Sequence, residues 1–450
     1  IVPNVTGFDA RASLLYPLMR YDGVHLMDGF CGFLTTEHGD AEVNAVAESF
    51  ERAVRTLQEQ GILLGEGEIT EQPTPPSARD DAESTFPLTE GQREIWMTSQ
   101  LGDAASLCFN EGAVVKLSGP LDVAALNRAL DRIVARHDAL RAVFDATGSH
   151  FTVQPAYHLE VEQIAAPDGT FDTVLDRIAD EAARYVFDLT TKPAIRARLV
   201  TNGQDRHGLV LNAHHIICDG WSYNIIFEEL AAFYRAETGG QAGDLPVPAS
   251  FAAHACTEQQ GTARPETRAF WAAQYRDIPA LPELPHDHPR PQRRSYAGAT
   301  LTRFIPADVM VAARKAGAKQ GCTLFSTLFG AVEMTLGRLS GCNDVVIGVP
   351  TGGQAQLANP HMIGHAVNFL PVRAAFDPAE PVSAHLKRVS GAVMDAFEHQ
   401  DYTFGTLVQD LNVPRALNRL PLTEIQFNLE TLPEDLDMGA VSVKLAPNRK

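Results

Sequence analysis

The sequence predicts a mixed α/β protein with more than one lobe. Its 450 residues are enough for two or three domain-sized units, each with its own core. Helical and strand patterns alternate along most of the chain and are not segregated, which favours the α/β class. Apolar residues make up 45% of the chain and charged residues 21%, proportions typical of globular proteins.

The first pattern is a helix over residues 41–60. Apolar side chains recur there at steps of three and four residues, and Gly61 provides a C-terminal cap. Residues 65–86 are rich in Pro, Glu, Ser and Thr and bury little apolar area, so we expect an exposed linker there. Residues 1–64 therefore form a first unit, separate from the rest.

Beyond the linker we expect two lobes, at 87–262 and 263–450. The patterns predict strands at 114–117 and 207–215 and helices at 121–137, 221–237 and around Trp271. A proline-rich crossing, IPALPELPHDHPRPQ, excludes regular structure at 278–292 and connects the lobes. The last residues alternate like a strand and then stop, so we expect the chain to be a piece of a larger protein.

Charge and composition exclude several classes of binding partner. The 56 acidic residues outnumber the 37 Lys and Arg, and a formal charge of -19 repels both nucleic acid and anionic lipid surfaces. No apolar run approaches the roughly 18 residues that a membrane span needs. Six scattered cysteines lack the spacing of a disulfide framework or a zinc site. We therefore expect a cytoplasmic protein that binds neither nucleic acid nor membrane.

The segment HGLVLNAHHIICDG, at 207–220, carries the most chemistry. Because neighbouring side chains of a strand face opposite ways, His214 and His215 cannot both serve one reacting atom. One imidazole is predicted to orient or deprotonate a nucleophile, and the other to be structural. Asp219 would fix the loop, while Gly220 would let the backbone turn and leave room beside the imidazole.

The pattern alone leaves three other interpretations open. The histidines can be a buried pair bonded to backbone, with Asp219 or Ser222 capping the next helix. A metal site would need His215 and Asp219 on one helical face, although the strand-like run and Gly220 oppose that helix and no third ligand is suggested nearby. Cys218 can be a nucleophile, although its apolar surroundings are typical of a structural thiol.

Six ordered motifs resemble the condensation domains of nonribosomal peptide synthetases. AHHIICDGWS at 213–222 resembles the family's HHxxxDG signature. The other five are LTEGQREIW at 88–96, RHDALRAVF at 136–144, IGHAVNFLPVR at 363–373, HQDYTF at 399–404 and RALNRLPL at 415–422.

The resemblance implies a fold and a reaction. The fold would be two chloramphenicol-acetyltransferase-like α/β lobes in a V, with a tunnel between them for two pantetheine arms. His215 would catalyse amide formation, and His214 and Asp219 would be structural, with Asp219 salt-bridged to Arg141. The tunnel would be lined by a set of four residues, Gly220, Trp221, Ser222 and Asn368.

The same resemblance implies the partners. An amine on one carrier domain would attack a thioester on another, so no metal or directly bound cofactor is needed. Substrates would arrive on phosphopantetheine arms of upstream and downstream carrier domains, beside adenylation domains of the same synthase.

The first unit carries a second resemblance. The segment that begins LLYPLMRYDGVHLMDGFCGF at Leu14 is similar to the C-terminal end of class III, pyridoxal-phosphate-dependent aminotransferases of mixed polyketide and peptide synthases. No Schiff-base lysine can be assigned within it, so the fragment would bind no cofactor alone. The resemblance implies an adjoining aminotransferase domain and a β-amino acyl donor.

The chain also departs from the family pattern. Thr403 and Gly405 stand where Pro and Glu are usual, and Ala416 and Asn418 where acidic and hydroxyl residues are usual. The members of the family continue past the last motif, so we expect the second lobe to be truncated. Three alternative functions stay open: epimerisation, ester formation, and a catalytically silent module that recruits carriers or tailoring enzymes.

Overall fold

The computed structural model describes residues 84–446 with short gaps, together with eight residues near the N-terminus. The gaps are 204, 242–244, 260, 262–263, 358, 376, 415, 417, 431–432 and 434–435, and the N-terminal residues are 44, 48–52 and 54–55. These eight are helical, as predicted for 41–60. The remainder of the predicted aminotransferase fragment, and residues 65–83 of the linker, lie outside the described residues. Residues 84–86, predicted as linker, instead belong to β1 (Ser84–Pro87).

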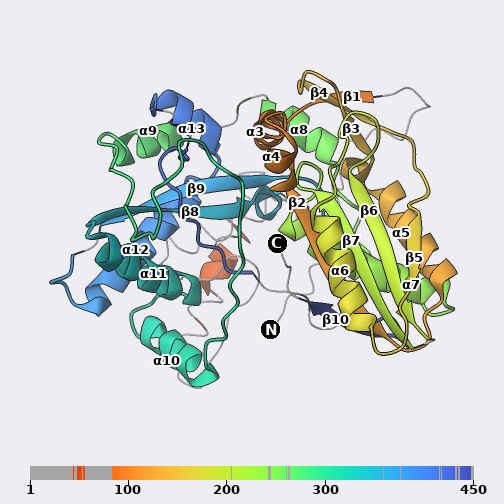
Figure 1. The fold of residues 1–450 in the computed structure, drawn as a ribbon. Coiled ribbons are helices and arrows are strands. Elements are labelled where there is room, and N and C mark those ends of the chain that lie inside the picture. Colours follow the sequence, from red (N-terminus) through yellow and green to blue (C-terminus); the bar gives the residue numbers. More distant parts are fainter. Residues whose placement is uncertain are drawn as a thin grey trace. The chain divides into compact units, whose positions relative to one another are not determined.

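A five-stranded sheet organises the first lobe, in the order β10-β2-β7-β6-β5 (Figure 1). β2 pairs antiparallel with both β7 and β10, whereas β5 and β6 run parallel. β10 comes from the end of the chain, so residues assigned to the second lobe complete the sheet of the first. The bounds are β2 (Asn110–Ser118), β5 (Val161–Ala165), β6 (Ile195–Asn202), β7 (Arg206–His214) and β10 (Ser442–Ala446).

β7 is buried along almost its whole length, because helices cover both faces of the sheet. α6 packs against β2, β6 and β7, while α5 packs against α7 on the other side (Figure 1). Gly208 allows this close packing, because a Cβ there would lie 2.6 Å from a methyl carbon of Leu175. The helices are α5 (Val123–Arg136), α6 (Phe171–Ala183) and α7 (Gly220–Glu237), in agreement with the prediction of helices at 121–137 and 221–237.

The second lobe centres on the antiparallel pair β8 (Asp344–Gly352) and β9 (Val367–Ala375). α11 packs on β8 and α12 on β9, and they bury a continuous apolar core that includes Phe329, Ile347 and Val389. Residues 278–306 contain neither helix nor strand, as the proline-rich pattern predicted. The helices are α9 (Pro265–Gln274), α10 (Ala307–Ala318), α11 (Leu324–Ser340), α12 (Val382–Glu398) and α13 (Phe404–Asp410).

Short elements complete the described part of the chain. A three-stranded sheet has the order β1-β4-β3, and α8 packs against β1. Among the described residues, no helix is long and apolar enough to cross a bilayer. The bounds are α3 (Glu90–Ser99), α4 (Asp103–Leu107), η2 (Asp138–Arg141), β3 (Ala142–Phe144), β4 (His150–Val153), α8 (Phe251–Gln259) and η3 (Gly353–Gln356).

Contacts between α3 and α13 account for the residues at positions 403 and 405. The Glu90 carboxylate accepts hydrogen bonds from the Thr403 hydroxyl at 2.6 Å and from the Thr406 hydroxyl at 2.7 Å. A Cβ at Gly405 would lie 2.2 Å from Glu90 Oε1 and 2.4 Å from Glu94 Oε1. A glutamate at 405 would clash with the Glu90 and Glu94 carboxylates and repel them. Thr403 instead donates a hydrogen bond to Glu90, and Gly405 leaves room for both carboxylates.

Candidate active site

β7 ends at His214, and His215 is the first residue of the turn that follows, one residue earlier than the predicted end of the strand. His214 is fully buried, its Nε2 lies 3.4 Å from the Ser106 hydroxyl, and its Nδ1 accepts a bond from the Ile216 backbone N–H. Burial, together with the neighbouring His215, lowers the pKa of His214 to about 3. His214 is therefore neutral at physiological pH and faces the interior.

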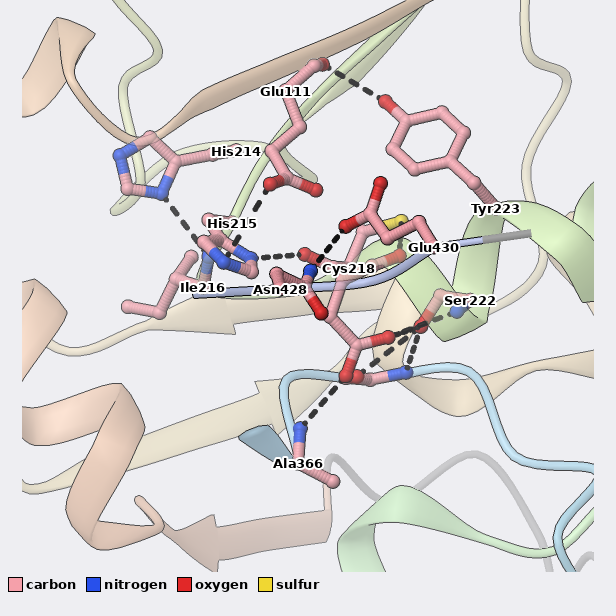
Figure 2. Close-up of polar contacts among 12 residues, drawn as sticks. Glu111, His214, His215, Ile216, Cys218, Ser222, Tyr223, Ala366, Asn428 and Glu430 are labelled. Carbon is pink, nitrogen blue, oxygen red and sulfur yellow. Dashed lines mark hydrogen bonds and ion pairs between the residues drawn. The ribbon is translucent and has the colours of Figure 1, made fainter. Parts of the chain in front are cut away.

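His215 points the other way, and its side chain keeps 23% exposure. Its Nδ1 lies 2.8 Å from the Cys218 carbonyl oxygen. Because a carbonyl only accepts, Nδ1 carries a proton, so the lone pair of the neutral tautomer is at Nε2. This nitrogen lies 3.6 Å from Oε1 of Glu111 on β2 (Figure 2). The ring is thus held at Nδ1, and its Nε2 faces the Glu111 carboxylate.

The turn between β7 and α7 fixes this orientation. Ile216, Ile217 and Cys218 are each fully buried, which anchors the carbonyl that holds the ring. Burial, reinforced by Asp219 and Glu111, raises the pKa of Cys218 well above its usual value. A thiol in that setting stays protonated and is a poor nucleophile, which argues against the cysteine interpretation.

Asp219 caps α7 and joins it to the second lobe. The carboxylate is fully buried, and its Oδ1 accepts from the Ser222 N–H at 2.8 Å and the Ser222 hydroxyl at 2.7 Å. Its Oδ2 accepts from Gln354 Nε2 at 2.8 Å and from the Ala366 N–H at 3.2 Å. Four neutral donors therefore hold this charge in place, and two of them come from distant parts of the chain.

The predicted salt bridge between Asp219 and Arg141 is wrong. Arg141 Nε donates to the Val134 carbonyl at 3.1 Å, and an Arg141 terminal nitrogen donates to the Gln154 carbonyl at 2.6 Å. No ion pair joins Arg141 to Asp219 in the described part of the chain. The physical reason is that Asp219 meets its donors on α7, η3 and the start of β9, whereas Arg141 ties η2 to the end of β4.

Two of the four predicted tunnel residues are exposed, and the other two make structural hydrogen bonds. Gly220 and Trp221 are exposed at the start of α7, with Trp221 at 40%. Ser222 is fully buried, because its hydroxyl bonds to Asp219 and also to both backbone groups of Gly364. Ser222 as a tunnel residue is therefore wrong.

Asn368, which is partly buried, makes structural hydrogen bonds, and its place in a tunnel stays a prediction. Its Nδ2 donates to the carbonyl oxygens of Gln400 and Tyr402 at 2.8 and 2.9 Å. Its Oδ1 accepts from the backbone N–H groups of Phe369 and Phe404. Three of these four bonds tie β9 to the connection between α12 and α13, and the fourth is made to the next residue of β9.

Two residues beside His215 were not predicted. The Glu111 carboxylate contacts its Nε2, and the His365 ring lies edge-on to its ring with centroids 4.6 Å apart. Gly91 makes room for His365, because a Cβ there would lie 2.9 Å from His365 Nε2. Burial, with smaller effects from His215 and His214, lowers the pKa of His365 well below its usual value. An acidic residue in the apolar run NEGAVVKL was the available signal for Glu111.

A second cluster surrounds Glu229, farther along α7. His137 Nε2 and His361 Nε2 each lie 2.9 Å from the buried Glu229 carboxylate, and Arg136 Nε lies 2.7 Å from it. The two imidazoles and the carboxylate are close enough to share a metal ion. The Arg136 guanidinium already places a positive charge beside Glu229 Oε1, the oxygen that His361 also contacts. We therefore interpret the cluster as a structural hydrogen-bond network, a brace that holds these segments together.

The brace predicts a pH-dependent loss of stability. Burial by itself would raise the pKa of Glu229, but bonds from His137, His361 and Arg136 lower it from 4.5 to about 2. A depressed carboxyl pKa stabilises the fold above pH 4.5, and that contribution, about 3 kcal/mol, is lost as the pH falls toward 2. Glu229→Gln should therefore lose less stability than the wild type between pH 5 and pH 3 in urea denaturation. Equal losses would contradict this prediction.

Comparison with known proteins agrees with this architecture. The family model described as "Condensation domain" matches residues 82–444. A linear gramicidin synthase protein of Brevibacillus parabrevis is 31% identical over 405 residues, which are 88% of this chain and 5% of that protein. A plipastatin synthase protein of Bacillus subtilis is also 31% identical, over 87% of this chain and 15% of that protein. The chain thus spans a small part of these relatives.

Solved structures show the same fold. The X-domain from teicoplanin biosynthesis has 25% sequence identity and a TM-score of 0.70, over 83% of this chain and 84% of that one. The first condensation domain of the CDA synthetase has 23% identity and a TM-score of 0.68, over 81% and 84%. Because the family model matches residues 82–444 and synthetase relatives match most of the chain, the chain belongs to the condensation domain family of nonribosomal peptide synthetases.

Proposed function

We propose that this domain joins two carrier-bound substrates by an amide bond. The α-amine of an aminoacyl thioester attacks the carbonyl carbon of a donor acyl thioester on the other carrier. The new C–N bond replaces the C–S bond, the donor carrier leaves as a thiol, and the lengthened chain stays on the acceptor carrier. The arrangement of His215 carries this proposal, because its Nε2 is the lone-pair nitrogen of a ring held by a buried turn.

His215 would act on the amine more than on the thioester. An α-amino group has a pKa of roughly 8, so a sizeable fraction of the acceptor is already neutral at physiological pH. Nε2 would accept a hydrogen bond from this amine and aim its lone pair at the carbonyl carbon. Because the thioester is already activated, positioning of the two tethered groups would contribute as much as proton transfer.

The proposed identity of the donor substrate depends on the first unit, residues 1–64. Residues 1–64 resemble the end of an aminotransferase, and such an enzyme would place an amine on the chain that reaches this domain. We therefore propose a β-amino acyl thioester as donor, delivered by an upstream carrier in a cytoplasmic polyketide-peptide synthase. An adenylation domain would supply the aminoacyl group on the downstream carrier.

A carrier assay tests the proposal. The donor is loaded as a 3-aminobutanoyl thioester on one phosphopantetheinylated carrier, and the acceptor carrier holds an amino acid, the matching hydroxy acid, or nothing. Mass spectrometry of the acceptor carrier should show an amide with the amino acid. Product with the hydroxy acid alone would favour ester formation. Deuterium uptake at an α-carbon without any joined product would favour epimerisation.

A recruiting module is the second candidate. The X-domain from teicoplanin biosynthesis has also been solved in a complex with OxyB, and the sequence of that X-domain is 26% identical to this chain. Retention of both histidines favours an enzyme. If the carriers bind but no product forms with any acceptor, the recruiting function is supported instead.

A further inference from the structure

The ring of His365 packs against the ring of His215. The two ring planes are nearly perpendicular, at 85°, and the ring centroids are 4.6 Å apart. His365 is only 7% exposed, and its Nδ1 has no hydrogen-bond partner among the residues that the structure describes. A buried polar atom without a partner costs free energy that an apolar side chain would avoid. Packing, and not a hydrogen bond at Nδ1, therefore holds this ring in place.

The backbone on both sides of His365 is tied to the start of α7. The Gly364 N–H donates to the Ser222 hydroxyl at 3.0 Å. The Ala366 N–H donates to the Asp219 carboxylate at 3.2 Å (Figure 2). Both acceptors are fully buried. These two bonds give the His365 ring a fixed position relative to the turn between β7 and α7.

The hydrogen bond of the His215 ring leaves its tilt open. The bond from Nδ1 to the Cys218 carbonyl, at 2.8 Å, fixes one corner of the ring. The torsion between Cβ and the ring is broad in histidine, so small rotations about it would move Nε2. Nε2 lies 3.6 Å from Glu111 Oε1, which is longer than a hydrogen bond. A second ring packed against the imidazole restricts this rotation.

We propose that His365 is a positioning residue for His215, and that its ring holds the plane of the catalytic imidazole so that Nε2 faces the attacking amine. This inference rests on the proposed amide-forming function, and His365 acts through His215 without touching the substrate. Rates depend steeply on such alignment, since a displacement of about 1 Å can cost about 100-fold. Burial lowers the pKa of His365 well below its usual value, so an uncharged ring can replace it.

Two substitutions separate ring packing from imidazole chemistry. His365→Ala removes the ring, and His365→Phe keeps an aromatic ring at the same position. In the carrier assay with the 3-aminobutanoyl donor, His365→Ala should lower kcat by about 10- to 100-fold and leave KM for the acceptor carrier within about twofold. His365→Phe should keep kcat within about fivefold of the wild type. A loss with Phe as large as with Ala would overturn the inference, because the imidazole itself would then be needed.

A double-mutant cycle tests whether His365 acts through His215. In a His215→Ala background the ring to be positioned is gone, so adding His365→Ala should change kcat by less than about twofold. Residual amide on the acceptor carrier is followed by mass spectrometry over long incubations. Similar losses in both backgrounds would overturn the inference, because the effect would then be independent of His215. If the wild type formed no amide, the proposed function itself would fail.

His385→Ala is the matched control. His385 is another buried histidine, on α12 of the second lobe, and its Nε2 lies 3.2 Å from the Gly330 carbonyl of α11. Its loss should lower the midpoint of thermal unfolding and leave kcat of the folded protein within about twofold. A slowing equal to that of His365→Ala would mean that the loss of any buried histidine explains the result, and the inference would be wrong.

Discussion

His215→Ala should lower kcat for amide formation by about 100- to 10,000-fold, the range that general acid–base groups contribute. The substitution removes Nε2 and also the bond from Nδ1 to the Cys218 carbonyl. The side chain is partly exposed and His214 anchors the end of β7, so the fold should be kept. Single-turnover formation of the amide on the acceptor carrier, measured with saturating carriers, checks this expectation.

His215→Asn separates orientation from proton acceptance. An asparagine amide can still donate to the Cys218 carbonyl, but it offers no basic nitrogen at the position of Nε2. If the lone pair matters, this variant should be as slow as His215→Ala. If His215→Asn kept a rate within about tenfold of the wild type, the proposal that Nε2 assists the amine would be wrong. Catalysis would then rest on positioning alone.

Local patterns predicted the elements that carry the site. Alternation predicted different roles for His214, at the end of β7, and His215, directly after it, and helical periodicity predicted α5 and α7. These features depend on neighbours within one element, which the sequence displays directly. The strand-like end of the chain was likewise identified as a strand, β10. Its pairing with β2 was not predicted, because period-two alternation shows a buried face without naming the partner strand.

The contacts between residues far apart in the sequence could not be predicted. Asp219 bonds to Gln354 and Ala366, which lie 135 and 147 positions away and carry no charge that would mark them as its partners. An arginine is the expected partner of a buried carboxylate, which made Arg141 attractive, yet neutral donors can satisfy the same oxygens. His365 escaped notice for the same reason, because only the folded chain brings its ring to His215.

Asp219→Ala should destabilise the fold by about 3 to 5 kcal/mol. It leaves the backbone N–H groups of Ser222 and Ala366 without their acceptor, each costing roughly 1 kcal/mol or more, and it removes the N-cap of α7. The Ser222 hydroxyl and the Gln354 amide also lose their bonds to the carboxylate and keep the Gly364 carbonyl as acceptor. Because the Cys218 carbonyl that holds His215 directly precedes this cap, activity should fall together with stability. Urea denaturation gives the free energy of unfolding, and the amide assay at low temperature gives the rate of the folded fraction.

A double-mutant cycle with Arg141→Ala decides between the two accounts of Asp219. In the structure Arg141 bonds to Val134 and Gln154 and shares no partner with Asp219, so the two losses of unfolding free energy should add to within about 0.5 kcal/mol. A coupling above about 1 kcal/mol would mean that a direct ion pair forms in solution. Additive losses, with Gln354→Ala coupled to Asp219→Ala, would place the carboxylate in the hydrogen-bond network that joins α7 to the second lobe.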